Sequence, residues 1–221
     1  LGLASQLTHQ MVEQLEVKRA LLENVDRHRS RGSIVSSNTS GIPLAAPAEG
    51  RSDDFRAHWL GTHFFNPPRY LRLLEVIPTA ETSKAVVDTV VHFADHRLGK
   101  GVVIAKDSPN FIGNHIALYG LMKILPKVAC SEYTIEEIDA ITGPAVGRPK
   151  SATFRTMDLA GIDILGHVVR NLHERVPDER DRATFVLPEF VGKMLERGAA
   201  GEKAGKGFFQ RVRKPTGESE I

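Results

Sequence analysis

A histidine and a glutamate lie twelve residues apart on two segments with strand-like patterns. His63 ends an apolar segment just before the turn Asn66-Pro67-Pro68, whereas Glu75 lies inside the otherwise apolar segment Leu73–Ile77. A buried carboxylate needs a partner, because an unpaired charge in the core is costly. A carboxylate beside the imidazole fixes its tautomer and stabilises its protonated form. The pattern predicts a catalytic base at His63 with Glu75 as its partner, and the alternative is a structural ion pair.

Hydroxyl and amide side chains follow another expected strand. The short β-branched segment Ser33–Ser37 runs into the turn formers Asn38-Thr39-Ser40-Gly41, and Asn114 lies on the first helix expected in the second half. Ligands of α/β sheets bind at the carboxyl ends of strands, so both groups are candidates for substrate binding. Backbone capping is the alternative, since turn residues of these types often bond to their own backbone.

Two other patterns are weaker. His92 and His96 have the i,i+4 spacing of a helical metal pair, but no further ligand set is evident and a solvated helix face explains both. The segment Gly201–Gly207 resembles a phosphate loop, yet Ala200 replaces its first glycine and Gly207 follows Lys206 in place of Ser or Thr. We therefore predict no metal site and no Walker motif.

The elements that would position these residues change in kind along the chain. Strands and helices mix up to residue 105, with a loop at Gly41–Asp54; we expect helices at about Thr8–His28 and Ser83–His96, and strands at Ser33–Ser37, His58–Phe65, Leu73–Ile77 and Val102–Ala105.

Helical patterns dominate afterwards. Ser108-Pro109 has the chemistry of an N-cap followed by proline at the first helical position, and Thr134–Glu137 matches a capping box. Gly143–Pro149 is an expected connector and Phe154–Leu172 an expected helix. The fold class is α/β followed by all-α, with domains at 1–106 and 107–210 and a polar tail at 211–221 that we expect to fray.

Composition limits the classes of function. The chain has 221 residues, 41% of them hydrophobic and 25% charged, with a formal net charge of +2 and no basic block, so no nucleic-acid partner is expected. Cys130 is the single cysteine, and no apolar run approaches the roughly 20 residues of a membrane span. The first ten residues lack the pattern of a signal peptide. We expect a globular cytoplasmic protein without a membrane span.

Five segments together resemble the signature segments of 3-hydroxyacyl-CoA dehydrogenases. They occur in the family's order between about Val12 and Phe209, and they are Ser37–Ser40, His63–Pro67, Leu74–Ile77, Lys106–Ile112 and Gly205–Phe209. An ordered set is far more specific than any one member. The resemblance implies a truncated Rossmann-like NAD-binding domain, followed by a helical C-terminal domain that binds substrate and forms a homodimer.

The resemblance also assigns roles to residues. It implies that His63 is the base and Glu75 its partner, and that Ser40 and Asn114 contact the acyl-CoA substrate. The implied contacts to NAD are Glu13, Lys18, Ser40, Asn66 and Lys203. The implied reaction is the oxidation of (S)-3-hydroxyacyl-CoA to 3-oxoacyl-CoA in fatty-acid beta-oxidation. Gly147–Arg155 is most similar to the branch fused to an enoyl-CoA hydratase domain, which makes such a domain an expected partner.

Some family features are missing from this sequence. The opening strand, the glycine-rich turn, its helix and the acidic residue that binds ribose have no counterpart, and residues 1 to about 11 do not match the strand expected before Glu13. His115 replaces the arginine usual after the asparagine. We expect the chain alone to bind NAD poorly and to turn over little substrate. The alternative function is a non-catalytic dimerising remnant or a fragment of a larger multifunctional enzyme.

Overall fold

The computed structural model describes residues 14–210, 212–213 and 219–220 of the chain. The chain divides into two compact units, residues 1–114 and 115–221. The border predicted from sequence follows Lys106, the second residue after the last strand of the first unit. Glu13 and the first part of the helix predicted at Thr8–His28 lie outside the described residues.

The first unit contains a four-stranded sheet with the order β1-β2-β3-β4. Strand β1 is parallel to β2, β2 is antiparallel to β3, and β3 is parallel to β4. The strands are β1 (Val35–Ser37), β2 (Trp59–Phe64), β3 (Leu73–Pro78) and β4 (Gly101–Ile104). All four strands were predicted, because each is a short apolar segment bounded by turn formers.

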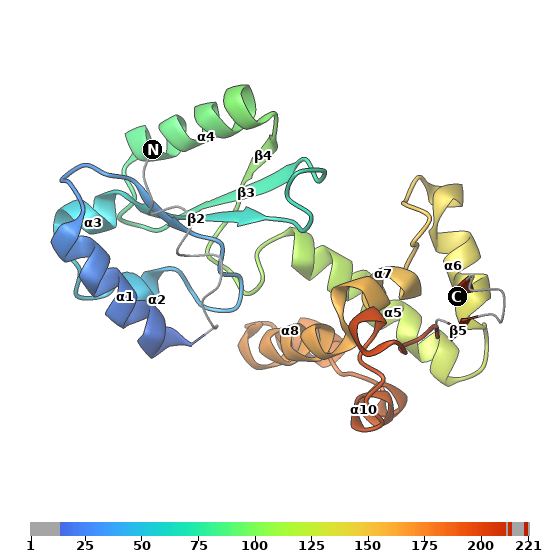
Figure 1. The fold of residues 1–221 in the computed structure, drawn as a ribbon. Helices are drawn as coiled ribbons and strands as arrows, with labels where there is room; N and C mark the ends of the chain where they lie inside the picture. Colours follow the sequence, from blue (N-terminus) through green and yellow to red (C-terminus); the bar gives the residue numbers. More distant parts are fainter. Residues whose placement is uncertain (1–13, 211, 214–218, 221) are drawn as a thin grey trace. The chain divides into compact units, whose positions relative to one another are not determined.

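Helices cover both faces of this sheet (Figure 1). On one face lies α4 (Lys84–Leu98), whose Ser83 N-cap accepts a hydrogen bond from the Val86 backbone. On the other face lie α1 (Leu15–His28) and the short helices α2 (Ala45–Ala48) and α3 (Asp53–Ala57). Side chains alternate along a strand, so Trp59 packs against the face that carries α1, α2 and α3, and Leu60 packs against α4.

The segment Gly41–Asp54, predicted as a loop, contains α2 and the start of α3. Helix α3 begins after Ser52, whose side-chain oxygen accepts a hydrogen bond from the Phe55 backbone at 3.1 Å. This N-cap signal is present in the sequence but was missed. The Asp107 carboxylate accepts hydrogen bonds from the Leu44 and Ala45 backbones at 2.8 and 3.3 Å, a long-range contact that sequence spacing does not reveal.

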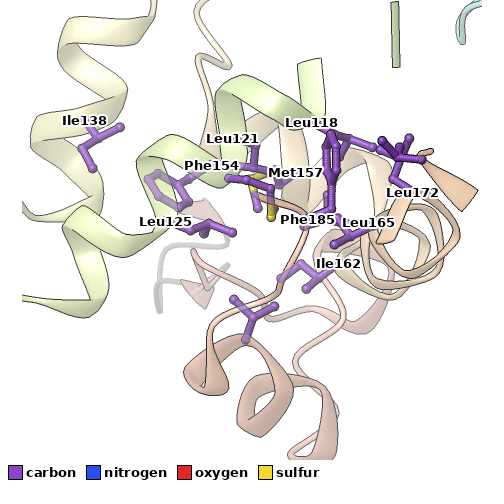
Figure 2. Packing of buried hydrophobic residues seen from close by; sticks show 14 residues of the cluster. Leu118, Leu121, Leu125, Ile138, Phe154, Met157, Ile162, Leu165, Leu172 and Phe185 are labelled. Carbon is purple, nitrogen blue, oxygen red and sulfur yellow. The ribbon is translucent and has the colours of Figure 1, made fainter. Parts of the chain in front are cut away.

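The second unit is built from helices around one apolar core (Figure 2). Its longer elements are α5 (Gly113–Ala129), α6 (Ile135–Thr142), α7 (Phe154–Ala160), α8 (Ile162–Arg175), α9 (Glu179–Thr184) and α10 (Glu189–Glu196). Two 3-10 turns, η2 (Pro144–Val146) and η3 (Glu202–Ala204), complete it. Leu121 and Leu125 of α5 pack with Phe154 and Met157 of α7 in this core. The capping box at Thr134 is confirmed, since its hydroxyl and the Glu137 carboxylate each bond to the other residue's backbone.

Three predictions for the second half were wrong in detail. No helix begins at Pro109, because Asn110 and Phe111 have left-handed backbone angles and α5 begins at Gly113. The helix predicted at Phe154–Leu172 is interrupted at Gly161, whose φ of 99° separates α7 from α8. In the tail, β5 (Val212–Arg213) pairs with β6 (Ser219–Glu220), where we expected fraying. None of the helices in the described part of the chain has the length and apolar character needed to span a bilayer.

Candidate active site

His63 and Glu75 are direct cross-strand partners on β2 and β3. The Nδ1 atom of His63 lies 2.6 Å from Oε2 of Glu75, and both side chains are buried. This confirms the predicted hydrogen bond between them. An ionised carboxylate only accepts hydrogen bonds, so Nδ1 carries the proton and the Nε2 lone pair is the basic position of the ring.

The second carboxylate oxygen of Glu75 binds the backbone where α5 begins. Oε1 accepts hydrogen bonds from Ile112 N at 2.9 Å and Gly113 N at 2.7 Å. Burial by itself raises the pKa of Glu75, but the hydrogen bonds from His63, Gly113 and Ile112 outweigh it and hold the pKa below its ordinary value. Glu75 therefore stays ionised beside the imidazole.

Aromatic rings enclose the His63 imidazole on the face of the sheet that carries α1. Phe65 and Phe111 meet it edge-on, with ring centroids 4.7 and 5.4 Å away. Gly113 makes room for Phe65, since a Cβ at Gly113 would lie 2.5 Å from the Phe65 ring. The packing limits the rotation of the imidazole, as a positioned base requires.

The turn after β1 combines backbone capping with a candidate binding group. Asn38 Oδ1 accepts a hydrogen bond from Phe64 N at 2.7 Å, and Ser37 Oγ accepts one from Thr39 N at 3.3 Å. Local capping thus explains Ser37, whereas Asn38 holds the turn to the end of β2. Ser40 is half-buried, and Asn114 is half-buried in the first turn of α5, directly after the Gly113 that binds Glu75.

The predicted cofactor residues lie in different places. Lys18 is a buried residue of α1, and Asn66 is exposed just beyond β2. Lys203 belongs to the second unit, where its Nζ forms an ion pair with Asp163 at 2.6 Å. Glu13 lies outside the described residues.

The segment Gly205–Phe209 clamps a buried carboxylate. The Asp158 oxygens accept hydrogen bonds from Phe208 N and Phe209 N, both at 2.8 Å. Burial raises the pKa of Asp158, and these two hydrogen bonds offset it only in part. A Cβ at Gly207 would lie 2.0 Å from Asp158 Oδ1, so the glycine is needed for close approach. This part of the signature supports the fold of the second unit.

The helical histidine pair has a local explanation. The rings of His92 and His96 stack with centroids 4.1 Å apart, and His96 Nδ1 contacts the His92 carbonyl at 3.2 Å. Among the described residues, no group of three or more His, Cys, Asp or Glu side chains is arranged to hold a metal ion.

Sequence reasoning missed a buried lysine beside the site. Lys100 donates hydrogen bonds to the carbonyls of Pro68 and Leu71, the second at 2.7 Å, and its ammonium lies 5.7 Å from the Phe64 ring centre. It thereby anchors the loop that joins the two strands bearing His63 and Glu75. A lysine just after Gly99, the C-cap of α4, gives no sequence signal for such a role.

Comparison with known proteins supports the same assignment. The family model described as the NAD-binding domain of 3-hydroxyacyl-CoA dehydrogenase matches residues 6–108, and the C-terminal domain of that family matches residues 111–211. The chain is 53% identical over 201 residues to a Bacillus subtilis protein named "Probable 3-hydroxyacyl-CoA dehydrogenase", a match that covers 91% of this chain and 25% of the relative. It is 45% identical over 203 residues to a Deinococcus radiodurans protein of the same name, covering 92% of this chain and 58% of the relative.

A solved structure agrees with both matches. The crystal structure of FadB2 from M. tuberculosis superposes with a TM-score of 0.82 at 28% identity, covering 91% of this chain and 69% of that chain. This chain spans less than two thirds of the two curated relatives described above. The two family domains nevertheless match in order and together account for most of its residues. The chain belongs to the 3-hydroxyacyl-CoA dehydrogenase family.

Proposed function

We propose that the chain acts in the NAD-dependent oxidation of (S)-3-hydroxyacyl-CoA to 3-oxoacyl-CoA, a step of fatty-acid beta-oxidation. The observation that carries the proposal is the buried hydrogen bond of 2.6 Å between His63 Nδ1 and Glu75 Oε2. It leaves Nε2 as a base enclosed by apolar rings.

In the proposed mechanism, His63 accepts the proton of the substrate 3-hydroxyl on Nε2. Glu75 keeps the Nδ1 proton in place and stabilises the imidazolium that forms, because its own charge is held by the Ile112 and Gly113 backbones. Ser40 and Asn114 hold the substrate oxygen so that the proton transfer is aligned. In the reverse direction, the imidazolium returns its proton to the same oxygen.

The proposed cofactor residues fit the nicotinamide end of NAD by their chemistry. Ser40 follows β1 and Asn66 follows β2, at the carboxyl ends of two parallel strands, where α/β sheets bind nucleotides. Hydroxyl and amide groups suit the ribose hydroxyls and the carboxamide, and we propose that Lys18, Lys203 and Glu13 complete the contacts. NAD held by these residues would supply the hydride acceptor for C3 of the substrate.

We also propose the assembly in which this chain works. The exposed apolar side chains Ile116 and Tyr119 on α5 favour a homodimer formed through the helical unit. The segment Gly147–Arg155 favours a fused or associated enoyl-CoA hydratase domain. The Bacillus subtilis relative, of which this chain matches only 25%, is a much longer polypeptide than this chain.

The proposed reaction is tested by the reduction of acetoacetyl-CoA with NADH, followed by NADH absorbance in the full-length protein. We expect His63→Gln to lower kcat by about 10²–10⁴-fold, because it removes the base, while substrate affinity changes little. His92→Gln is the matched control, since His92 is an exposed histidine of the same unit. Near-normal turnover of His63→Gln would remove His63 from the role of base.

A further inference from the structure

Two consecutive residues before α5 have a backbone conformation that L-residues seldom adopt. Asn110 has φ 58° and Phe111 has φ 53°, and both are buried, with exposed fractions of 1% and 3%. Asparagine tolerates the left-handed region, but for a bulky residue such as phenylalanine it is strained. Strain of this kind persists only where the surrounding structure compensates for it.

The left-handed turn directs two backbone donors at Glu75. Ile112 and Gly113 follow the turn immediately, and their N–H groups both reach Oε1 of Glu75. The turn is held from the other side by the hydrogen bond from Phe111 N to Ser108 O at 3.0 Å. An ordinary helical start at Pro109 would rotate these peptide planes and send the two N–H groups elsewhere.

The Phe111 side chain contacts the other member of the pair. Its ring meets the His63 imidazole edge-on at 5.4 Å, and it belongs to the same buried cluster as Leu22, Trp59 and Ile77. One residue therefore touches His63 through its ring and reaches Glu75 through the turn that it helps to form. Phe111 is also anchored in the core, which supplies the packing that offsets its strain.

We propose that Phe111 is a positioning residue for the His63–Glu75 pair, with its left-handed backbone orienting two donors toward Glu75 and its ring fixing the imidazole. The catalytic consequence rests on the proposed function, whereas the effect on Glu75 does not. Within the described part of the chain, His63 is the side chain that donates a hydrogen bond to Glu75, and the remaining donors to its carboxylate are the two backbone groups.

The matched variants Phe111→Gly and Phe111→Ala test whether the left-handed backbone at Phe111 orients the two donors toward Glu75. Both lack the ring, but glycine adopts the left-handed conformation freely and alanine does not. Asn110→Gly and Asn110→Ala form a second pair in which the Phe111 ring is intact. If Phe111→Ala does not fold, this second pair tests the effect of the left-handed turn on Glu75. The first readout is the pKa of the Glu75 carboxyl, measured by carbon NMR and assigned with Glu75→Gln.

We expect each alanine variant to raise the pKa of Glu75 above that of its glycine counterpart, because the two N–H donors that lower it are displaced. In the full-length protein we also expect kcat of Phe111→Ala to be about 100-fold below wild type, with Phe111→Gly between the two and KM for acetoacetyl-CoA changed less. Leu22→Ala, in the same cluster, is the control for lost packing, and we expect it to lower the melting temperature without changing the Glu75 pKa.

Equal Glu75 pKa values in the glycine and alanine variants would overturn the proposal. So would a Leu22→Ala variant that shifts the Glu75 pKa as far as Phe111→Ala does. A wild-type protein that does not reduce acetoacetyl-CoA would contradict the proposed function, and the NMR comparison would still decide the role of Phe111.

Discussion

Glu75 keeps a charge in the core because three donors share its two oxygens. His63 binds Oε2, and the backbones of Ile112 and Gly113 bind Oε1. Each donor replaces a water molecule that the carboxylate loses on burial. At this scale, the same contacts that serve the proposed chemistry also stabilise the fold, so their contribution is measurable without substrate.

Glu75→Gln should lower the free energy of unfolding near pH 7 by roughly 1.5–3 kcal/mol, since charge-assisted hydrogen bonds become neutral ones. The folded-state pKa of Glu75 lies below the ordinary value of 4.5. The contribution of the ionised Glu75 to the free energy of unfolding is therefore fully present above pH 4.5 and is lost as the pH falls through the folded-state pKa. The stability difference between wild type and Glu75→Gln should shrink as the pH falls below about 4.5, which urea unfolding at several pH values measures.

Glu174→Gln is the control for this comparison, because Glu174 is an exposed residue of α8. Its effect should stay within about 0.5 kcal/mol at every pH. A gap between wild type and Glu75→Gln that is constant from neutral to acid pH would show that the Glu75 charge does not stabilise the fold.

The pairing of His63 with Glu75 was predictable because a carboxylate in an apolar strand needs a partner and a neighbouring strand supplies one. The family resemblance strengthened that prediction. The role of Phe111 was not predictable, because it depends on the sign of one backbone dihedral. Asp107 and Lys100 were missed for a related reason: each bonds to backbone groups more than 25 residues away, and no local pattern marks such contacts.

At the scale of elements, α7 is joined to the loop after α10 by one buried carboxylate. Asp158 on α7 accepts the two hydrogen bonds from Phe208 and Phe209, and Gly207 passes against it. Gly201 also lies against Asp158, since a Cβ added at Gly201 would lie 2.4 Å from the Asp158 carbonyl oxygen. Gly201 and Gly207 therefore serve close packing against Asp158, which gives these two glycines a structural role in place of phosphate binding.

Gly207→Ala should destabilise the protein by about 1–3 kcal/mol or more, because the added methyl displaces the Asp158 carboxylate from its donors. Urea unfolding followed by circular dichroism measures the change. Gly192→Ala is the matched control: Gly192 lies in α10 with open space around its Cβ position, so alanine should stabilise that helix by up to about 1 kcal/mol. Equal unfolding midpoints for Gly207→Ala and wild type would show that the close approach of Gly207 to Asp158 does not stabilise the fold.

Element types were predicted better than element boundaries. Apolar periodicity identified the four strands of the first unit and α4, whose capping residues are local. The start of α5 depends instead on Glu75, a residue 37 positions away from Ile112. The break at Gly161 also involves long-range contacts, because Ile162 N donates a hydrogen bond to Ala200 O at 3.2 Å and a Cβ at Gly161 would lie 3.4 Å from Lys203 Nζ.

At the scale of the whole molecule, the change from mixed α/β to helical patterns predicted the order of the two folds. The NAD-binding and C-terminal family domains match the chain in that order. The sequence does not show which apolar side chains the second unit leaves uncovered, since that depends on how its helices pack. In the structure, large apolar side chains of this unit remain exposed; they include Ile116, Tyr119, Leu159, Ile164 and Val186.

We expect these side chains to be covered by a second copy of the chain. Ile116 and Tyr119 lie three residues apart on α5 and so share one face, with exposed fractions of 66% and 42%. Light scattering at micromolar concentration should give twice the chain mass of 24.3 kDa. Ile116→Asp should shift the mass toward the monomer, because a charge would be buried in the interface. Ile34→Asp, at an exposed position of the first unit, is the control and should leave the measured mass unchanged. A wild-type mass near 24.3 kDa would contradict the dimer.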